Sequence, residues 1–505
     1  MAFGDQFYTT FGEQFCIYSV WKVVHGCVVY EWPQRGWYSL SLYNWLLYYF
    51  YGGACLLFKV DGMQIAELGR FLTVMFAVAG SCLTFFLTSN LVRSLKMTPN
   101  PFIIAAGSLL IWFAPGTMAD FSNTIRGDTP ALFFALCGTA AFLRALNSKS
   151  SLWPLISSGI LFYIGWSFKQ SAVWTFTACC LCAFFLQGWK RALLFAASWV
   201  VPVFITFVLG GGAYLFNIAT APSVNQIKFH NIVVFLPQIV ARGAFVYGWL
   251  FCLPFLVYWK QWFKEEGKYV IPRFAKLPLA VQPAFVFAAI AITGVTMGVI
   301  MLGKEGSRGN MLFEGMVALG VLAIAGLHRL LSSEIRHRNI WLGYVCLLFA
   351  ISSALTTRNL VFFRNGNMGT LPLISSADYT EKKAFGQWVL TLSPPLYIHD
   401  PLFAQPWYAN AGNFPGILID PVFYDRAKSI GLLEGGGLQS LVKKHYFKTL
   451  LLTADDELAK VAKQSGYTQV TIPPDHAYYQ SCIFPWKEGP LLMFIRSQGN
   501  QHLPD

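Results

Sequence analysis

Long apolar runs alternate with short polar stretches between residues 70 and 358. The run 71–92, FLTVMFAVAGSCLTFFLTSNLV, contains no charged residue, and a helix needs about 20 apolar residues to cross a bilayer. Backbone amides in lipid must be hydrogen-bonded within the segment, so we expect these runs to be helices. The pattern predicts about ten spans, at 71–92, 101–119, 129–147, 152–168, 171–188, 192–214, 236–257, 282–302, 311–330 and 340–357.

The polar stretches between these runs differ in charge. Every second stretch, starting with the first, is basic: Arg93 with Lys96, Arg144 with Lys149, Lys190 with Arg191, and the segments 258–276 and 328–338. Lys and Arg favour the cytoplasmic side of a membrane. We therefore expect these stretches inside, and the other stretches and both chain ends outside, in a multi-pass protein of the inner (plasma) membrane.

Composition agrees with this class. Of the 505 residues, 55% are hydrophobic and only 12% charged, against roughly 25% charged in soluble domains. The net charge of +13 could indicate nucleic-acid binding, but that requires basic residues gathered on one face. Here they are spread between apolar runs, which excludes a nucleic-acid partner and leaves membrane lipids.

The first 69 residues form an outer loop rather than a span. Residues 40–58 are apolar but rich in Tyr and Trp, which concentrate at the bilayer surface, so interfacial helices are expected here. No apolar segment precedes the polar start of the chain. Either the downstream helices insert this outer end unaided, or the start lies inside a longer reading frame, which we favour.

Beyond Arg358 the pattern changes, and polar residues and prolines return. Short apolar stretches bounded by turn residues predict strands, and two stretches have helical spacing. The predicted strands are 395–400, 415–420, 448–453, 467–472 and 491–496, and the predicted helices are 420–433 and 438–447. The predicted fold is mostly α: an outer loop (1–69), a polytopic transmembrane helical bundle (70–358), and a linker with an extracytoplasmic α/β domain (359–505).

Polar residues on the predicted outer face are the candidates for chemistry. They are Asp5 and Glu13 before the first span, Arg126 and Asp128 in the second outer stretch, Lys169 in the next, and Lys304, Asn310 and Glu314 in a later one. A charge at mid-membrane costs about 2.5–3.5 kcal/mol, so such residues face a cavity or extend to the interface at helix ends. Their gathering on one face favours a site.

Several of these stretches resemble the GT-C membrane glycosyltransferases, in the bacterial branch related to protein O-mannosyltransferases and the lipid A aminoarabinose transferase. The stretch from GDQFYTTFGEQF to the aromatic segment 40–52 resembles the first outer loop of that family, in which an acidic residue precedes a Tyr (here Asp5 and Tyr8). RGDTPALFF resembles the stretch in which the Asp of the family's second outer loop leads into a span. FKQSAVW is similar to a Lys-Gln or Lys-Gly pair in the family, and GSRGNMLFE is similar to a stretch with Gly-Ser, Asn and Leu-Glu in that order. The Arg-Gly-Asp of residues 126–128 is then part of a site, rather than an adhesion tripeptide or an accidental loop end.

Two departures from the family pattern stand out. Asp5 is followed by Gln6, where the family usually has Glu, so no cofactor is assigned, and a divalent metal and its ligands stay open. The first span of the family, normally just upstream of that Asp, is missing from the sequence, which agrees with a longer reading frame.

The residues suit transfer of a sugar from a polyprenyl phosphate. The leaving phosphate needs fixed cations, for which Arg126, Lys169 and Lys304 are available. An acceptor hydroxyl needs a base, and Asp5 is the candidate that the resemblance also implies. Glu13 and Asp128 compete for that role. The expected reaction is a single displacement that inverts the anomeric carbon, with Tyr8, Glu13, Asn310 and Glu314 as further substrate contacts.

Other functions stay open at this point. In a transporter or flippase of lipid-linked sugars, the intramembrane Lys and Glu would be coupling groups, although such proteins commonly show duplicated halves. A non-catalytic scaffold is a third possibility. The sequence identifies neither the sugar nor the acceptor, which can be a lipid, a glycan or a protein.

Overall fold

The structure is a computed structural model of the whole chain. It describes residues 13–32, 40–62, 64–113, 119–122, 124–148, 151–242, 277–304, 309–331, 437–454 and 456–473, together with short pieces at 264–265, 268–269, 339–344, 346–347, 350, 354, 384–385, 388–389, 391–393, 395–398, 430–431, 478–480 and 488–496.

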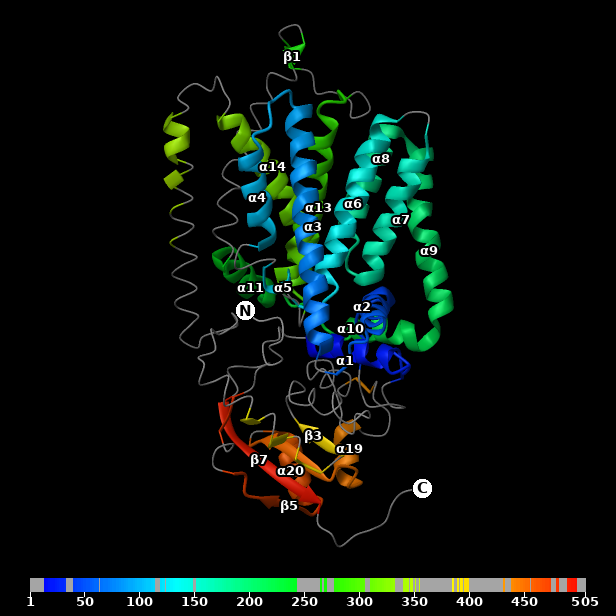
Figure 1. Cartoon of the computed structure of the whole chain (residues 1–505), viewed down its shortest axis with the longest axis vertical. Helices are drawn as coiled ribbons and strands as arrows, with labels where there is room; N and C mark the ends of the chain where they lie inside the picture. Colours follow the sequence, from blue (N-terminus) through cyan, green and yellow to red (C-terminus); the bar gives the residue numbers. More distant parts are fainter. Residues whose placement is uncertain are drawn as a thin grey trace.

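A bundle of helices running roughly in one direction makes up most of the molecule (Figure 1). Its long members are α3 (Gln64–Ser94), α6 (Asp128–Asn147), α7 (Trp153–Phe168), α8 (Trp174–Gln187), α9 (Trp189–Leu215), α13 (Gln282–Leu302) and α14 (Phe313–Leu331). Shorter α4 (Pro101–Phe113) and α5 (Ala119–Ser122) lie beside α3, and α11 (Phe229–Arg242) lies at the edge.

Within the described residues, five helices are long and apolar enough to cross a membrane: Gln64–Ser94, Asp128–Asn147, Trp189–Ser223, Gln282–Leu302 and Asn310–Leu331. Each coincides with a predicted span, so the chain is a membrane protein of mostly helical fold. The predicted spans 101–119, 152–168 and 171–188 correspond to the shorter helices α4, α7 and α8. Spans 236–257 and 340–357 lie largely outside the described residues, and the count of ten stays a prediction.

Small residues let the helices approach closely. A Cβ on Gly294 of α13 would lie 2.6 Å from the backbone nitrogen of Gly315 in α14, so these two backbones are in direct contact. Such small-residue contacts are typical of membrane helices. This contact fixes the start of α14 against α13, next to the starts of α6 and α8 (Figure 1).

Helices α1 (Glu13–Val24) and α2 (Trp45–Phe58) lie at one end of the bundle (Figure 1). With 14 residues, α2 is shorter than a span requires, in agreement with an interfacial helix. Helix α9 bends back toward them, because Gly211 has a left-handed φ of 68° that interrupts it. The π-helix η2 (Phe216–Thr220) and the short α10 (Ala221–Ser223) follow.

Strands β3 (Leu396–Ile398), β4 (Thr449–Thr453), β5 (Tyr467–Val470) and β7 (Glu488–Arg496) form a mixed sheet beyond that end. Their order is β3-β4-β7-β5, with β3 parallel to β4, the other pairs antiparallel, and β6 (Tyr478–Gln480) on β7. Four predicted strands are therefore confirmed, whereas 415–420 lies outside the described residues. Helices α19 (Gly437–Lys443) and α20 (Glu457–Gln464) accompany the sheet; the predicted helix 438–447 corresponds to α19, and 420–433 is mostly outside the described part.

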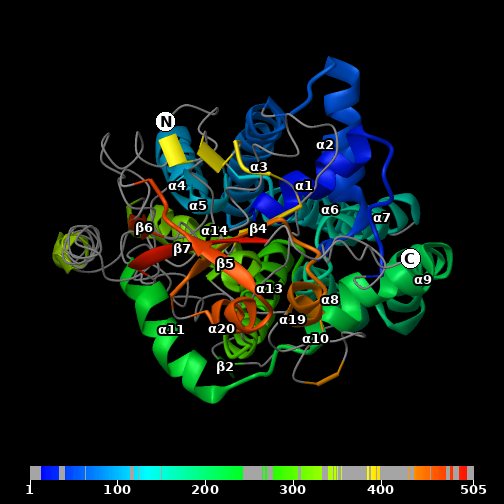
Figure 2. The ribbon, with the colours of Figure 1, turned by 90° about the horizontal axis from the view of Figure 1, so that it is seen from below.

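The two faces of the sheet pack differently. Leu450 and Leu452 of β4 join a core with Leu438 of α19 and Ala462 of α20. Leu451, which points the other way because strand side chains alternate, joins a core that includes Trp21 of α1. Figure 2 shows the strands and α20 in front of the bundle when seen from this end. A small hairpin of β1 (Lys264–Glu265) and β2 (Lys268–Tyr269) lies at the opposite end (Figure 1).

Candidate functional site

Asp128 is the centre of a buried cluster at the start of α6. The Lys169 ammonium donates to its Oδ1, as does Nδ2 of Asn310 at 2.8 Å. Arg126 Nε lies 3.3 Å from Oδ2 in an ion pair. Three segments far apart in sequence thus meet on one carboxylate, which also stands in the first turn of a helix, where negative charge is favoured.

Gly127 is what allows Asp128 and Lys169 to meet. A Cβ at residue 127 would lie 2.4 Å from the carbonyl oxygen of Phe168 and 3.1 Å from Cβ of Lys169. The loop before α6 and the end of α7 therefore touch backbone to backbone. The middle residue of the Arg-Gly-Asp tripeptide is glycine because no side chain fits there.

Both cations of the cluster are buried. Burial lowers the pKa of the Lys169 ammonium, and the adjacent Asp128 carboxylate opposes this shift. The Arg126 guanidinium donates to the Tyr43 hydroxyl at 2.8 Å and lies 4.7 Å from the Phe121 ring centre. Arginine stays charged under all ordinary conditions, so the cluster contains two cations and one carboxylate.

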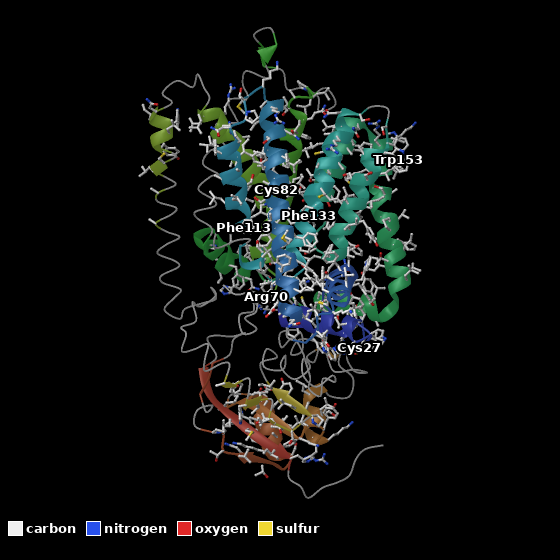
Figure 3. The ribbon with its side chains drawn as sticks, viewed as in Figure 1. Cys27, Arg70, Cys82, Phe113, Phe133 and Trp153 are labelled. Carbon is white, nitrogen blue, oxygen red and sulfur yellow. The ribbon has the colours of Figure 1, made fainter. Side chains whose placement is uncertain are left out.

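Glu13 lies close by in a separate pair. Both of its oxygens accept from Arg70, from Nε and from a terminal nitrogen, at 3.0 Å each, and Oε1 also accepts from the backbone N–H of Ile125 at 2.9 Å. Glu13 is fully buried. Its carboxylate therefore ties α1 and α3 to the residue just before Arg126; Figure 3 shows Arg70 at that end of α3.

The segment 40–44, which carries Tyr43, is held by hydrogen bonds to distant residues. The Gln170 side chain donates to the carbonyl of Leu42, and Tyr214 donates to the Asn44 side chain at 2.8 Å. Asn217 of η2 accepts from the backbone of Ser41 at 3.0 Å. The bend of α9 thus places η2 where it fixes the partner of Arg126.

Glu314 binds the start of α8. Its Oε2 accepts from the backbone N–H and the hydroxyl of Thr175, at 2.6 Å each. Helix starts have unpaired N–H groups, and Val173, the residue at the cap, makes no such bond with its own side chain. The carboxylate therefore caps α8 from the neighbouring helix α14 as well as facing the site.

A small pocket opens beside the cluster. Its polar lining is Asp128, Lys169, Ser171, Asn310 and Glu314, with Trp174 on α8 and the apolar Ala131, Leu132, Met311 and Phe313. The Oδ1 atom of Asn310 is buried without a hydrogen-bond partner, whereas Oδ2 of Asp128 has the ion pair with Arg126. A buried acceptor without a partner is uncommon and costs stability.

The other predicted site residues are placed differently. Lys304 does not line this pocket; it pairs through its backbone with Ile227, and burial lowers the pKa of its ammonium. Asp5 and Tyr8 lie outside the described residues. Among the residues that the structure describes, no group of three or more His, Cys, Asp or Glu side chains is arranged to hold a metal ion.

Four residues of the site were missed by sequence reasoning. Tyr43 and Arg70 pair with predicted residues across 83 and 57 positions of sequence, and no local pattern reveals such partners. Trp174 and Thr175 follow Lys169 closely, within the WSFKQSAVW stretch and just after it. Their position shortly after Lys169, a charged residue between two apolar runs, is the sequence feature that could have indicated them.

No protein-family model matches the sequence, and no curated protein matches it. Solved structures do. ArnT from Cupriavidus metallidurans bound to undecaprenyl phosphate is 12% identical, with a TM-score of 0.56, over 98% of this chain and 96% of that one. Its apo state gives a TM-score of 0.54 at 12% identity, over 97% and 94%. The oligosaccharyltransferase AglB from Archaeoglobus fulgidus, in complex with an inhibitory peptide and a dolichol-phosphate, gives 0.48 at 13% identity, over 98% and 71%.

The likeness to ArnT extends over nearly the whole of both chains. It defines the class of the fold: a bundle of membrane helices with a strand-containing part at one end. More particularly, the chain has the fold of ArnT, in agreement with the GT-C fold that the sequence motifs resemble. The resemblance of fold inferred from the sequence motifs is confirmed.

Proposed function

We propose that the protein is a membrane glycosyltransferase that moves a sugar from a polyprenyl-phosphate donor to an acceptor. The observation that carries the proposal is the buried cluster of Arg126, Lys169 and Asp128 beside the pocket. Two cations share the Asp128 carboxylate in this cluster, and the Glu314 carboxylate, which also lines the pocket, is engaged by the N–H and hydroxyl of Thr175. The positive charge that the cluster retains is available to an anion. The GT-C fold supports this proposal by analogy only, since one fold can host several functions.

In this proposal the donor phosphate binds Lys169 and Arg126. Fixed cations in a buried site stabilise the charge that develops on a leaving phosphate. Asp128 holds both cations in place and Asn310 orients Asp128. Because its Oδ1 already accepts two hydrogen bonds, Asp128 is less suited than Asp5 to take a proton.

The base in the proposed reaction is Asp5. Its carboxylate accepts the proton of the acceptor hydroxyl while the hydroxyl oxygen attacks the anomeric carbon of the sugar. The bond from that carbon to the phosphate oxygen breaks as the new bond forms, so the configuration inverts. Tyr8 and Lys304 are proposed as further substrate contacts. Glu13 acts through Arg70 and Ile125 on the position of the loop that carries Arg126.

We further propose that the strand-containing part from 359 onward is an extracytoplasmic domain over the site, in a chain divided at 69 and 358. The inner membrane is the proposed location. The charge distribution supports this orientation: α3, α6 and α14 have basic residues in their last turns, at the end of the bundle away from the strands (Figure 1).

A transferase and a carrier predict different fates for a labelled sugar. The purified protein in lipid vesicles is supplied with undecaprenyl-phosphate-linked radiolabelled sugars and an envelope extract. We expect label in a new compound, together with free undecaprenyl phosphate. Label that crosses the vesicle membrane while still attached to its lipid would contradict the transferase and support a flippase.

A further inference from the structure

The strand-containing part has basic residues gathered at one end of its sheet. β4 begins directly after Lys448 and β7 ends at Arg496, and the Arg496 N–H donates to the Lys448 carbonyl at 3.0 Å. Lys463 is in the last turn of α20, Lys443 ends α19, and Lys444 begins the turn after it. The four lysines are exposed and Arg496 is half-buried. These five residues, the basic end, form a positively charged surface.

The acidic residues that the structure describes in this part lie away from the basic end. Asp456 and Glu457 follow the other end of β4, where the Asp456 N–H donates to the Thr453 carbonyl at 3.0 Å, and Glu488 starts β7 on that side. β4 has five residues, and a strand rises about 3.4 Å per residue, so the two groups are separated by more than the Debye length of about 8 Å. These carboxylates therefore offset the positive charge of the basic end only weakly.

A fixed turn adds an aromatic ring to this surface. His445 has a left-handed φ of 53°, which is uncommon outside glycine. The N–H groups of His445 and Tyr446 close α19 on the carbonyls of Val442 and Leu441, at 3.0 Å each, and the His445 ring stacks on Tyr467 with 5.1 Å between ring centres. Tyr446 is 38% exposed, and Lys444 and Lys448 flank it in sequence.

The basic end does not lie against the helix bundle. Figure 1 shows β7, in red, ending on the side of the sheet that faces away from the bundle. A basic surface that binds lipid headgroups has to lie at the membrane. A partner of the basic end therefore belongs to the aqueous compartment into which the sheet projects.

A glycan with anionic groups matches both features of this surface. Its negative charges are attracted by the clustered lysines, and the C–H faces of its sugar rings pack on an aromatic ring, which offers a rigid apolar surface. An acidic polypeptide uses the charge of the lysines, but it has no sugar ring to place on Tyr446. The combination of lysines with an exposed tyrosine thus favours a glycan.

We propose that the basic end binds an acidic glycan, a polysaccharide with anionic sugars, outside the membrane. The inference rests on the extracytoplasmic location proposed above and does not depend on the transfer reaction. Lys443, Lys444, Lys448, Lys463 and Arg496 supply the charge, and Tyr446 packs on a sugar ring.

The test uses purified full-length protein in a neutral detergent. Dissociation constants are measured by fluorescence anisotropy for labelled oligogalacturonate, for neutral dextran, and for poly-L-glutamate of the same charge as the oligogalacturonate. We expect oligogalacturonate to bind about tenfold or more tightly than either of the others, and its binding to weaken as salt is added. Lys444→Ala combined with Lys448→Ala should weaken oligogalacturonate about tenfold. Tyr446→Ala should weaken it severalfold and leave poly-L-glutamate unchanged.

Arg93→Ala combined with Lys190→Ala is the matched control, because it removes two exposed charges at the opposite end of the bundle; it should leave all constants unchanged. No binding of oligogalacturonate by wild-type protein, or unchanged binding in the double lysine variant, overturns the proposal. Equal binding of poly-L-glutamate assigns the surface to an acidic protein and also overturns it. The assay contains no lipid-linked sugar, so its failure leaves the proposed transferase standing, and absence of sugar transfer leaves this inference standing.

Discussion

Gly127 connects one residue of the sequence to the geometry of the whole cluster. A methyl group there would collide with the Phe168 carbonyl oxygen at 2.4 Å, so Gly127→Ala must move the Asp128 loop away from Lys169. We expect binding of undecaprenyl phosphate to weaken at least tenfold while the purified protein remains folded. Gly53→Ala is the control, since a Cβ at Gly53 meets nothing within 4 Å. Normal lipid binding by Gly127→Ala would show that the close approach is not required.

The charge of Lys169 should make donor binding depend on pH. Burial lowers its pKa and Asp128 opposes that effect, so Asp128→Asn should lower the pKa further. Phosphate binding requires the ammonium form; we therefore expect the alkaline loss of binding to begin at a lower pH in Asp128→Asn. Lys169→Arg should abolish this alkaline limb, because arginine does not deprotonate. Identical pH profiles in the three proteins would exclude Lys169 as the phosphate-binding cation.

Four residues that the sequence placed on one face, Arg126, Asp128, Lys169 and Asn310, lie together in the structure. They stand in the stretches between or beside apolar runs, and a charge within a span is costly, so such residues could be singled out from the sequence, whereas their partners could not. The pairing of Glu13 with Arg70 was not predictable, since it depends on how α1 packs against α3. Glu314 was predicted as a substrate contact, and its bonds to Thr175 add a capping role that only the structure reveals.

Among the elements, α1 and α3 are joined by the buried pair of Glu13 and Arg70. Removing one partner of a buried ion pair costs about 3–5 kcal/mol, because the other charge is left uncompensated. Arg70→Met should therefore lower the thermal unfolding midpoint strongly and weaken lipid binding through the loop at Ile125. Arg93→Met, at the exposed end of the same helix, is the control and should change neither. An unchanged midpoint in Arg70→Met would contradict a stabilising role for the pair.

Helix positions were largely predictable and helix lengths were not. Apolar runs located α3, α6, α9, α13 and α14 because lipid-facing helices must be apolar over their full length. In contrast, α8 (Trp174–Gln187) is shorter than the predicted span 171–188. The bend of α9 at Gly211 was also unpredictable, as glycine adopts left-handed and helical conformations with similar ease.

For the molecule as a whole, orientation in the membrane is the open prediction. Figure 3 shows Cys27 and Trp153 at opposite ends of the bundle, with Cys27 at the end near the strands. Cys27 is exposed. In a variant that retains only this cysteine, a membrane-impermeant maleimide added to intact cells should label it. A single cysteine introduced as Trp153→Cys should be labelled only after permeabilisation; the reverse result would invert the topology.

In the proposed reaction, the Lys169 ammonium stabilises the negative charge that develops on the leaving lipid phosphate during sugar transfer. The most direct measurement is the turnover of an undecaprenyl-phosphate-linked sugar by purified wild-type protein, Lys169→Met and Lys190→Met, in which Lys190 is exposed at the opposite end of the bundle. We predict that Lys169→Met reduces turnover at least 100-fold, in line with about 10²–10³-fold for the loss of one fixed donor to a developing anion, and that Lys190→Met matches wild type. Turnover by Lys169→Met equal to that of wild type would contradict the account.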